Sequence, residues 1–208
     1  MERKIRITIG IAALLAIFGC ATTKIDSFKD PQANGKTYKN ILVFGSFSDL
    51  GAKKSAEEAF SRVFLAQGVN AVPSITVFLP TRTYKEEEIA KILKEGGFDS
   101  VLSISLKKAY NDRVYVPGQS NTDCKTYSYG RTHCDTSRSP GYYVTKPRIK
   151  CELKLMDVET DTTAWVASSF TRGNSYADIN VMSESLAREA LDKLAKEGLV
   201  TLTPKPQK

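Results

Sequence analysis

The stretch Asn-Ile-Leu-Val-Phe-Gly at residues 40–45 decides the fold that we expect for this chain. Its four apolar residues, Ile41 to Phe44, follow one another without alternation and are bounded by a polar residue and a glycine. An uninterrupted apolar run of this length is typical of a strand that is buried on both faces. Helices are expected to cover such a sheet, so the stretch favours an α/β fold.

A helical pattern and a second strand follow. Apolar residues recur every three or four positions over residues 52–64, with polar residues between them. This spacing predicts an amphipathic helix that ends near Gly68. Residues 69–72 form the second expected strand, which Pro73 ends, and residues 74–80 can continue extended or form a loop.

The same alternation is repeated once more. Thr83 with Glu86 three residues later forms a capping box, which predicts the start of a second helix, and two glycines at residues 96–97 end it. Residues 101–106 are apolar enough for a third strand, which residues 107–116 can extend. The order strand–helix–strand–helix–strand predicts a mainly parallel sheet with covering helices.

The pattern changes in the second half of the chain. Apolar and polar residues alternate over residues 149–155, which predicts a half-buried strand. A turn at residues 159–162 separates it from a further strand at residues 163–170, so the two are expected to pair as an antiparallel hairpin. Residues 179–194 have the spacing of a last helix. The complete prediction is one α/β domain of order β-α-β-α-β-β-β-α with a mixed sheet.

The domain boundaries follow from composition. We expect the folded domain at residues 39–202, with a long inserted loop at residues 117–141 that is rich in Ser, Thr, Gly and Tyr. Residues 20–38 have no apolar period and are predicted to form a flexible tether, and residues 203–208 a polar tail. Residues 1–19 are predicted to be a signal peptide.

The end of the signal peptide indicates a lipid anchor. A basic segment precedes an apolar run at residues 7–18, which is too short to cross a hydrocarbon core that needs about 20 residues. Ile17, Gly19 and Cys20 resemble the lipobox of bacterial lipoproteins. That resemblance implies a diacylglycerol on the Cys20 sulfur and a fatty acyl group on its nitrogen, which together would anchor the chain stably to a membrane.

The residue after the anchor suggests a destination. Ala21, in place of an aspartate, resembles the default signal for sorting to the outer membrane. We therefore expect a protein anchored in the outer membrane with its domain facing the periplasm.

The other cysteines lie in an oxidising compartment if this is correct. Cys124 and Cys134 flank nine residues of the expected loop, so they are the predicted disulfide, which would stabilise the loop by roughly 2–3 kcal/mol. Cys151 lies on an apolar strand face and is expected to be a buried free thiol. A metal site of these two loop cysteines with His133 and Asp135 is the alternative, but the spacing does not match a structural zinc site and we expect none.

The loop region also carries candidate residues for contact with a partner. Tyrosine and arginine favour interaction surfaces because they supply contact area at low entropic cost. Tyrosine is equally common in strands for plain packing, so both interpretations remain open. The candidates are Tyr127, Tyr129, Arg131, Tyr142 and Tyr143.

Charge and motifs narrow the function classes. The formal charge of +7 falls to +5 without residues 1–19, and the positive residues are expected to be spread over helices and strands. Nucleic acid is not an expected partner, because export removes the opportunity. The single histidine and the absence of the usual hydrolase, metalloprotease and phosphate-binding motifs predict a protein that is not an enzyme. The carboxylates at residues 57–58 and 86–88 are expected on exposed helix faces.

The order of elements behind a lipobox resembles a group of bacterial envelope lipoproteins whose domains are similar to the amino-terminal domain of TolB and, more distantly, to the core of CsgG. The residues that carry this resemblance are 39–43, 68–73 and 157–165. It implies a non-enzymatic role in envelope assembly or in scaffolding a membrane complex through protein–protein contacts, and no cofactor or catalytic residue. A small-ligand or envelope-polymer binding module is the alternative.

Overall fold

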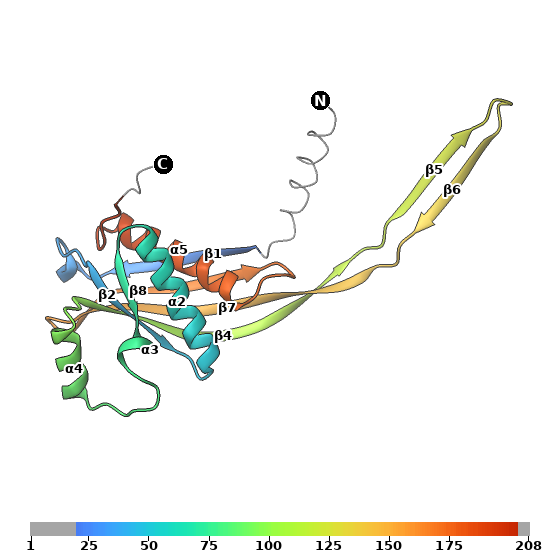
Figure 1. Ribbon diagram of the computed structural model, residues 1–208. Helices are drawn as coiled ribbons and strands as arrows, with labels where there is room; N and C mark the ends of the chain where they lie inside the picture. Colours follow the sequence, from blue (N-terminus) through green and yellow to red (C-terminus); the bar gives the residue numbers. More distant parts are fainter. Residues whose placement is uncertain (1–19, 204–208) are drawn as a thin grey trace, which may run out of the picture.

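A computed structural model describes residues 20–203 of the chain (Figure 1). The predicted signal peptide, residues 1–19, and the tail residues 204–208 lie outside the described residues.

The domain is built on one six-stranded mixed sheet, with the strand order β1-β8-β7-β4-β2-β3. Strand β2 is parallel to both of its neighbours, and all other pairs are antiparallel. The expected α/β fold with a mixed sheet is therefore confirmed. The strands are β1 (Ala21–Lys29), β2 (Asn40–Ser46), β3 (Asn70–Pro73), β4 (Ser100–Val116), β7 (Tyr142–Asp157) and β8 (Thr162–Gly173).

Two long helices, α2 (Leu50–Ala66) and α5 (Ile179–Lys196), cover one face of the sheet and pack against each other (Figure 1). Each begins at an aspartate whose side chain accepts a hydrogen bond from a backbone N–H in the first turn. Their buried side chains, such as Phe60 and Leu194, meet Leu153 and Trp165 of the sheet in a single core. The two predicted helices of this layer are therefore present.

The opposite face of the sheet is covered much less. The short helix α3 (Ser74–Val77) forms where an extended segment or a loop was expected. Helix α4 (Glu86–Glu95) has no fully buried residue. It begins three residues after the predicted capping box at Thr83, because Glu88 accepts the hydrogen bond from the Lys85 backbone N–H and defines the first turn. None of the helices among residues 20–203 combines the length and the apolar character required to cross a bilayer.

The prediction of a flexible tether at residues 20–38 is wrong. Strand β1 occupies nine residues of this segment and pairs with β8 along its whole length, from Ala21 opposite Gly173 to Lys29 opposite Trp165. Its sequence lacks an apolar period because β1 is an edge strand that buries only Ile25. The remaining stabilisation comes from main-chain hydrogen bonds that the sequence does not reveal. The fold therefore starts directly after Cys20, whose carbonyl oxygen accepts a hydrogen bond of 2.9 Å from the Asn174 N–H.

The expectation that Glu57 lies on an exposed helix face is also wrong. Its side chain is completely buried. It accepts hydrogen bonds from the Gly45 N–H at 2.8 Å, the Ser74 hydroxyl at 2.7 Å and the Ile75 N–H at 2.9 Å. These donors lie at or directly after the ends of two parallel strands. Glu57 therefore links α2 to this edge of the sheet, which is the edge where α/β proteins commonly bind ligands. Its neighbour Glu58 is exposed as expected.

The stretch predicted as an inserted loop, residues 117–141, is a second β-structure. Strands β5 (Ser120–Thr126) and β6 (Thr132–Arg138) form a separate two-stranded hairpin. Every residue from 117 to 140 is exposed, so the segment has no apolar pattern from which strands could be predicted.

Candidate functional site

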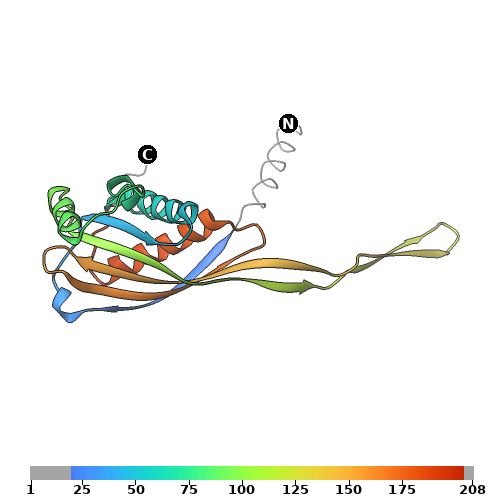
Figure 2. The same cartoon turned by 90° about the horizontal axis from the view of Figure 1, so that it is seen from below.

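The most distinctive feature of the molecule is an arm that projects from the end of the sheet. Strand β7 pairs with β8 only from Arg148 onward, whereas β4 and β7 remain paired as far as Val116 opposite Tyr142. Beyond this ladder, β5 and β6 continue outward. We call residues 111–147 the arm. From Asn111 to the tip it can span up to about 60 Å at the usual rise of a strand, and both views show it running clear of the domain (Figures 1 and 2).

One arginine, Arg148, whose side chain is only 12% exposed, fixes the root of the arm. The Arg148 guanidinium donates hydrogen bonds to the Pro147 carbonyl at 3.0 Å and to the Gly173 carbonyl at 2.9 Å. It also forms an ion pair of 2.8 Å with Asp112 on the other strand of the arm. Gly173 is the partner of Ala21 in the sheet, so Arg148 joins the arm to the end of the sheet where Cys20 lies. Sequence reasoning missed this residue, since its partners come from three separate segments.

Two glycines form the joint between the ladder and the outer hairpin. A Cβ atom on Gly118 would lie 2.1 Å from the Ser139 carbonyl oxygen, and one on Gly141 would lie 2.0 Å from the Tyr115 hydroxyl. A side chain at Gly118 would force the two strands apart, because it would meet backbone atoms, whereas one at Gly141 would displace the Tyr115 ring. Each glycine stands beside a proline in the sequence, and this pair of Pro/Gly dipeptides is a signal for the joint.

The outer hairpin has two chemically different faces. The first carries three cross-strand pairs: Thr122 with Thr136, the Cys124–Cys134 disulfide, and Thr126 with Thr132. Both threonine pairs form hydroxyl–hydroxyl hydrogen bonds of 3.0 Å, so this face satisfies its own polar groups. The predicted disulfide is thus present between directly opposed residues, with Cα atoms 4.0 Å apart. Because it consumes both thiols, neither cysteine is available as a metal ligand.

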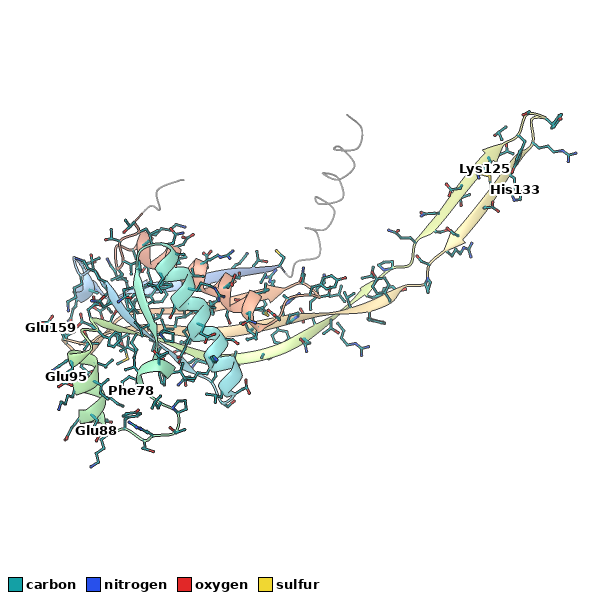
Figure 3. The ribbon with its side chains drawn as sticks, in the orientation of Figure 1. Phe78, Glu88, Glu95, Lys125, His133 and Glu159 are labelled. Carbon is teal, nitrogen blue, oxygen red and sulfur yellow. A yellow bond between two sulfur atoms is a disulfide. The ribbon has the colours of Figure 1, made fainter. Side chains whose placement is uncertain are left out.

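The second face of the hairpin is charged. Lys125 lies opposite His133, and the turn beyond them brings Tyr127 opposite Arg131 (Figure 3). Tyr129, at the end of the turn, is 93% exposed. No carboxylate occurs between residues 124 and 134. Just outside this stretch, an Asp135 carboxylate oxygen lies 3.2 Å from His133 Nε2, so Lys125 and Arg131 supply the positive charge of this aromatic tip.

The structure separates the five predicted contact residues into two groups. Tyr127, Tyr129 and Arg131 lie together at the tip, whereas Tyr142 and Tyr143 lie on the inner ladder. Tyr142 and Tyr143 are neighbours in one strand and so point to opposite faces. The Tyr143 ring lies 5.2 Å from the Tyr115 ring and 5.3 Å from the Arg113 guanidinium. Tyr143 contacts these two side chains but stays 63% exposed, and the tip group is the better candidate for contact with a partner because Tyr129, at 93%, is the most exposed of the candidate tyrosines.

The net positive charge of the chain gathers at the arm and its root, although most Lys and Arg residues are spread over the rest of the chain, as predicted. Residues 107–150, the arm and its root, contain nine Lys and Arg and three Asp, a net charge of +6. The rest of the chain after residue 19 contains 18 Lys and Arg and 19 Asp and Glu, a net charge of −1. The arm itself, residues 111–147, contains five Lys and Arg and three Asp, a net charge of +2, so most of the basic excess lies at its root.

Two buried groups outside the arm have perturbed protonation. Burial raises the pKa of the Cys151 thiol to about 11, and a hydrogen bond from Ser169 opposes this shift only in part. Cys151 is therefore the inert buried thiol that its strand position predicts.

At the far end of the sheet, Asp157 joins three segments. It accepts hydrogen bonds from Lys36 at 2.6 Å, from the Tyr38 hydroxyl at 2.9 Å and from two N–H groups of the β7–β8 turn. Burial acts to raise the pKa of Asp157, but these hydrogen bonds outweigh it and hold the pKa well below its usual range. Burial and the nearby Asp157 raise the pKa of Tyr38. The buried, fully bonded arrangement identifies Asp157 as a structural link.

No protein-family model matches the sequence, and no curated protein is significantly similar to it. The fold is similar to that of a solved PelC dodecamer from Paraburkholderia phytofirmans, at 16% identity and a TM-score of 0.49 over 83% of this chain and 97% of that chain. It is also similar to the lipoprotein GNA1162 from Neisseria meningitidis, at 13% identity and a TM-score of 0.41 over 76% of this chain and 99% of that chain. At these identities and scores, the function has to be argued from the residues of this chain. The resemblance to the TolB and CsgG domains stays a prediction.

Proposed function

We propose that this chain is a lipid-anchored, non-enzymatic protein of the bacterial envelope that scaffolds or assists an envelope complex through protein–protein contacts made by its arm. The observation that carries the proposal is the arm itself. It is an exposed, cross-linked hairpin whose root lies at the same end of the sheet as Cys20, the predicted lipidation site. Anchoring in the outer membrane, with the domain facing the periplasm, is part of the proposal.

The construction of the arm supports a role in binding. A two-stranded hairpin in water is marginally stable, because it buries little apolar surface. This one is held in shape by a disulfide and by two threonine pairs, none of which packs against the domain. A projection maintained in this way has no function in the stability of the core, whereas its tip presents the residue types that dominate protein interfaces.

The geometry of the anchor supports a position close to the membrane. Because β1 begins at Ala21, only the lipidated residue would separate the folded domain from the bilayer. The arm leaves the sheet at this end. It would therefore lie close to the lipid headgroups. Partners within the same membrane or bound to its surface would be within reach.

The distribution of reactive side chains favours a non-enzymatic role. His133, the single histidine, lies on the outer hairpin with a 70% exposed side chain. The edge of the sheet where α/β enzymes usually place a site is closed by Glu57 and its three donors. Lys36 and Tyr38 both donate hydrogen bonds to Asp157, so these three polar side chains are occupied with one another's charge and hydrogen bonds through that carboxylate.

A second candidate function is binding of an anionic envelope polymer. The net charge of +6 on the arm and its root favours it, because a basic surface with exposed tyrosines suits both negative charges and sugar rings. Titration of the protein with an anionic polysaccharide at low and high salt separates the two candidates. Saturable, salt-sensitive binding would support the polymer-binding function. Absence of such binding would favour the function in protein–protein contacts.

Photo-crosslinking in living cells tests the main proposal. A photo-reactive amino acid would replace Tyr129 at the tip or, as a matched control, Tyr176, a tyrosine of the domain that is 69% exposed. We expect reproducible crosslinks to a protein from the tip position only. Equal capture from both positions, or none from the tip, would overturn the proposal.

A further inference from the structure

We infer that the arm has a specific protein partner, a second copy of this chain, and that its tip docks into an acidic groove at the opposite end of the neighbouring molecule. This inference rests on the proposed function, since it takes the arm as the contact site. It goes further in naming the partner and the surface that receives the tip.

The receiving groove lies between helix α4 and the far end of the sheet, and it has a volume of about 670 Å³. Its floor is apolar: Ile89 and Leu93 come from α4, and Val101 and Met156 come from β4 and β7. All four side chains remain partly exposed, and α4 has no fully buried residue. An amphipathic helix with its apolar stripe left half open is an incomplete interface.

The rim of the groove is acidic. Glu86 and Glu87 line it from the start of α4, and Glu159 and Asp161 line it from the β7–β8 turn. Lys94 is the only basic residue among those that line the groove. Figure 3 shows Glu159 at the end of the molecule away from the arm, together with Glu88 and Glu95. Apolar aromatic rings with positive charges around them would therefore fit this groove best.

The arm tip has this chemistry. Tyr127 and Tyr129 supply two exposed rings, and Lys125 and Arg131 place positive charges beside them, whereas His133 lies 3.2 Å from Asp135. The rings can cover the apolar floor while the basic groups meet the acidic rim. Charge complementarity of this kind selects and orients a partner more than it adds affinity.

The tip cannot reach the groove of its own molecule. The outer hairpin joins β7 at Tyr142, whereas the groove is at Met156, near the other end of the same strand. Tip and groove are separated by a distance on the order of 80 Å along nearly extended chain, and the arm leads away from the groove (Figures 1 and 3). The contact must therefore be between molecules. Because the two surfaces differ, it is head-to-tail, and repetition would give a ring or a row of copies.

Charge reversal tests the inference. The protein would be residues 20–208 with Cys20→Ser, which contains every strand and helix of the fold. A tip variant carries Lys125→Glu and Arg131→Glu, and a groove variant carries Glu86→Lys and Glu159→Lys. The matched control reverses Lys193 and Lys196 to Glu in the last turn of α5, because neither residue lines the groove or belongs to the arm. Sedimentation velocity over a concentration series would measure self-association.

We expect self-association in the parent and the control, at least tenfold weaker association in either single-surface variant, and recovery when tip and groove reversals are combined in one chain. Circular dichroism would check that each variant is folded. A monomeric parent, or association that neither reversal weakens, would overturn the inference. A monomeric parent together with crosslinks from Tyr129 to a different envelope protein would be a separate outcome. It would overturn the inference that the partner is a second copy, and it would leave the proposed function intact.

Discussion

The two ends of strand β7 are stabilised in different ways. From Ile149 to Leu155 every second residue is buried against α2 and α5, so the core determines the conformation. From Tyr142 to Pro147 the same strand leaves the sheet and is only partly covered. There the conformation depends on cross-strand pairs and on Arg148 at the root. A strand whose side chains are not needed for the core can present them to a partner. The domain and the arm therefore differ in what their side chains do.

The largest expected effect is in the core of the domain. Phe60→Ala removes a completely buried ring that packs 5.9 Å from Phe64, and we expect it to lower the free energy of unfolding by about 3–5 kcal/mol. Tyr129→Ala removes an exposed ring of the arm and should change it by less than about 0.5 kcal/mol. Chemical denaturation of both variants checks this contrast. Similar losses from the two changes would mean that the arm is part of the cooperative core.

The link at Asp157 gives the next largest effect. Asp157→Asn keeps the shape but removes the charge that Lys36 and Tyr38 face, and we expect a loss of about 2 kcal/mol at neutral pH. The folded-state pKa of Asp157 is depressed, so its contribution to stability is complete above the unfolded value of about 3.9 and fades as the pH falls through the folded value. The difference between parent and variant should therefore shrink below about pH 4. A difference that stays constant with pH would contradict this assignment.

A smaller and more local effect is expected at the root of the arm. Arg148→Gln removes the ion pair to Asp112 and weakens the hydrogen bonds to β8, which should cost about 1–2 kcal/mol. Hydrogen exchange should quicken at residues 142–147 while residues 149–157 remain protected. The control is Arg138→Gln, a change at an exposed arginine of the outer hairpin. It should alter neither the free energy of unfolding nor the hydrogen exchange of these residues. Uniformly faster exchange throughout the sheet would show that Arg148 belongs to the core.

The smallest effect on the domain is expected from the disulfide. Replacing both Cys124 and Cys134 with serine opens the outer hairpin, in which the bridge is worth about 2–3 kcal/mol in the chain-entropy picture. The domain does not pack on this hairpin, so its free energy of unfolding should change by less than about 0.5 kcal/mol. Limited proteolysis should become faster within residues 117–141 alone. Loss of the whole fold would show that the disulfide stabilises the domain as well as the outer hairpin.

The sequence predicted the parts of the fold that the core determines. The helices α2 and α5 carry apolar periods because each buries one face in the core. In the run Ile41 to Phe44, the first three residues are buried as predicted, whereas Phe44 is 37% exposed. Cys151 was placed correctly on a buried face for the same reason. Strand β1 was missed because it is an edge strand that contributes only Ile25 to that core.

The arm was recognised as unusual, but its structure was not predicted, because all of its outer residues are exposed. A different signal was present. Thr122, Cys124 and Thr126 are repeated in reverse order as Thr132, Cys134 and Thr136 around the turn, which is the symmetry of an antiparallel hairpin. Arg148 and Glu57 gave no such signal, since their partners come from segments that only the tertiary structure brings together.

Removal of the outer hairpin tests the division between domain and arm most directly. Val116 and Tyr142 lie opposite each other, so the dipeptide Asn-Gly can replace residues 117–141 and close the ladder with a tight turn. The shortened protein should unfold with a free energy within about 0.5 kcal/mol of the parent, and the envelope proteins that crosslink to the parent in cells should no longer be captured. A destabilised domain, or capture of the same proteins without the hairpin, would contradict the account.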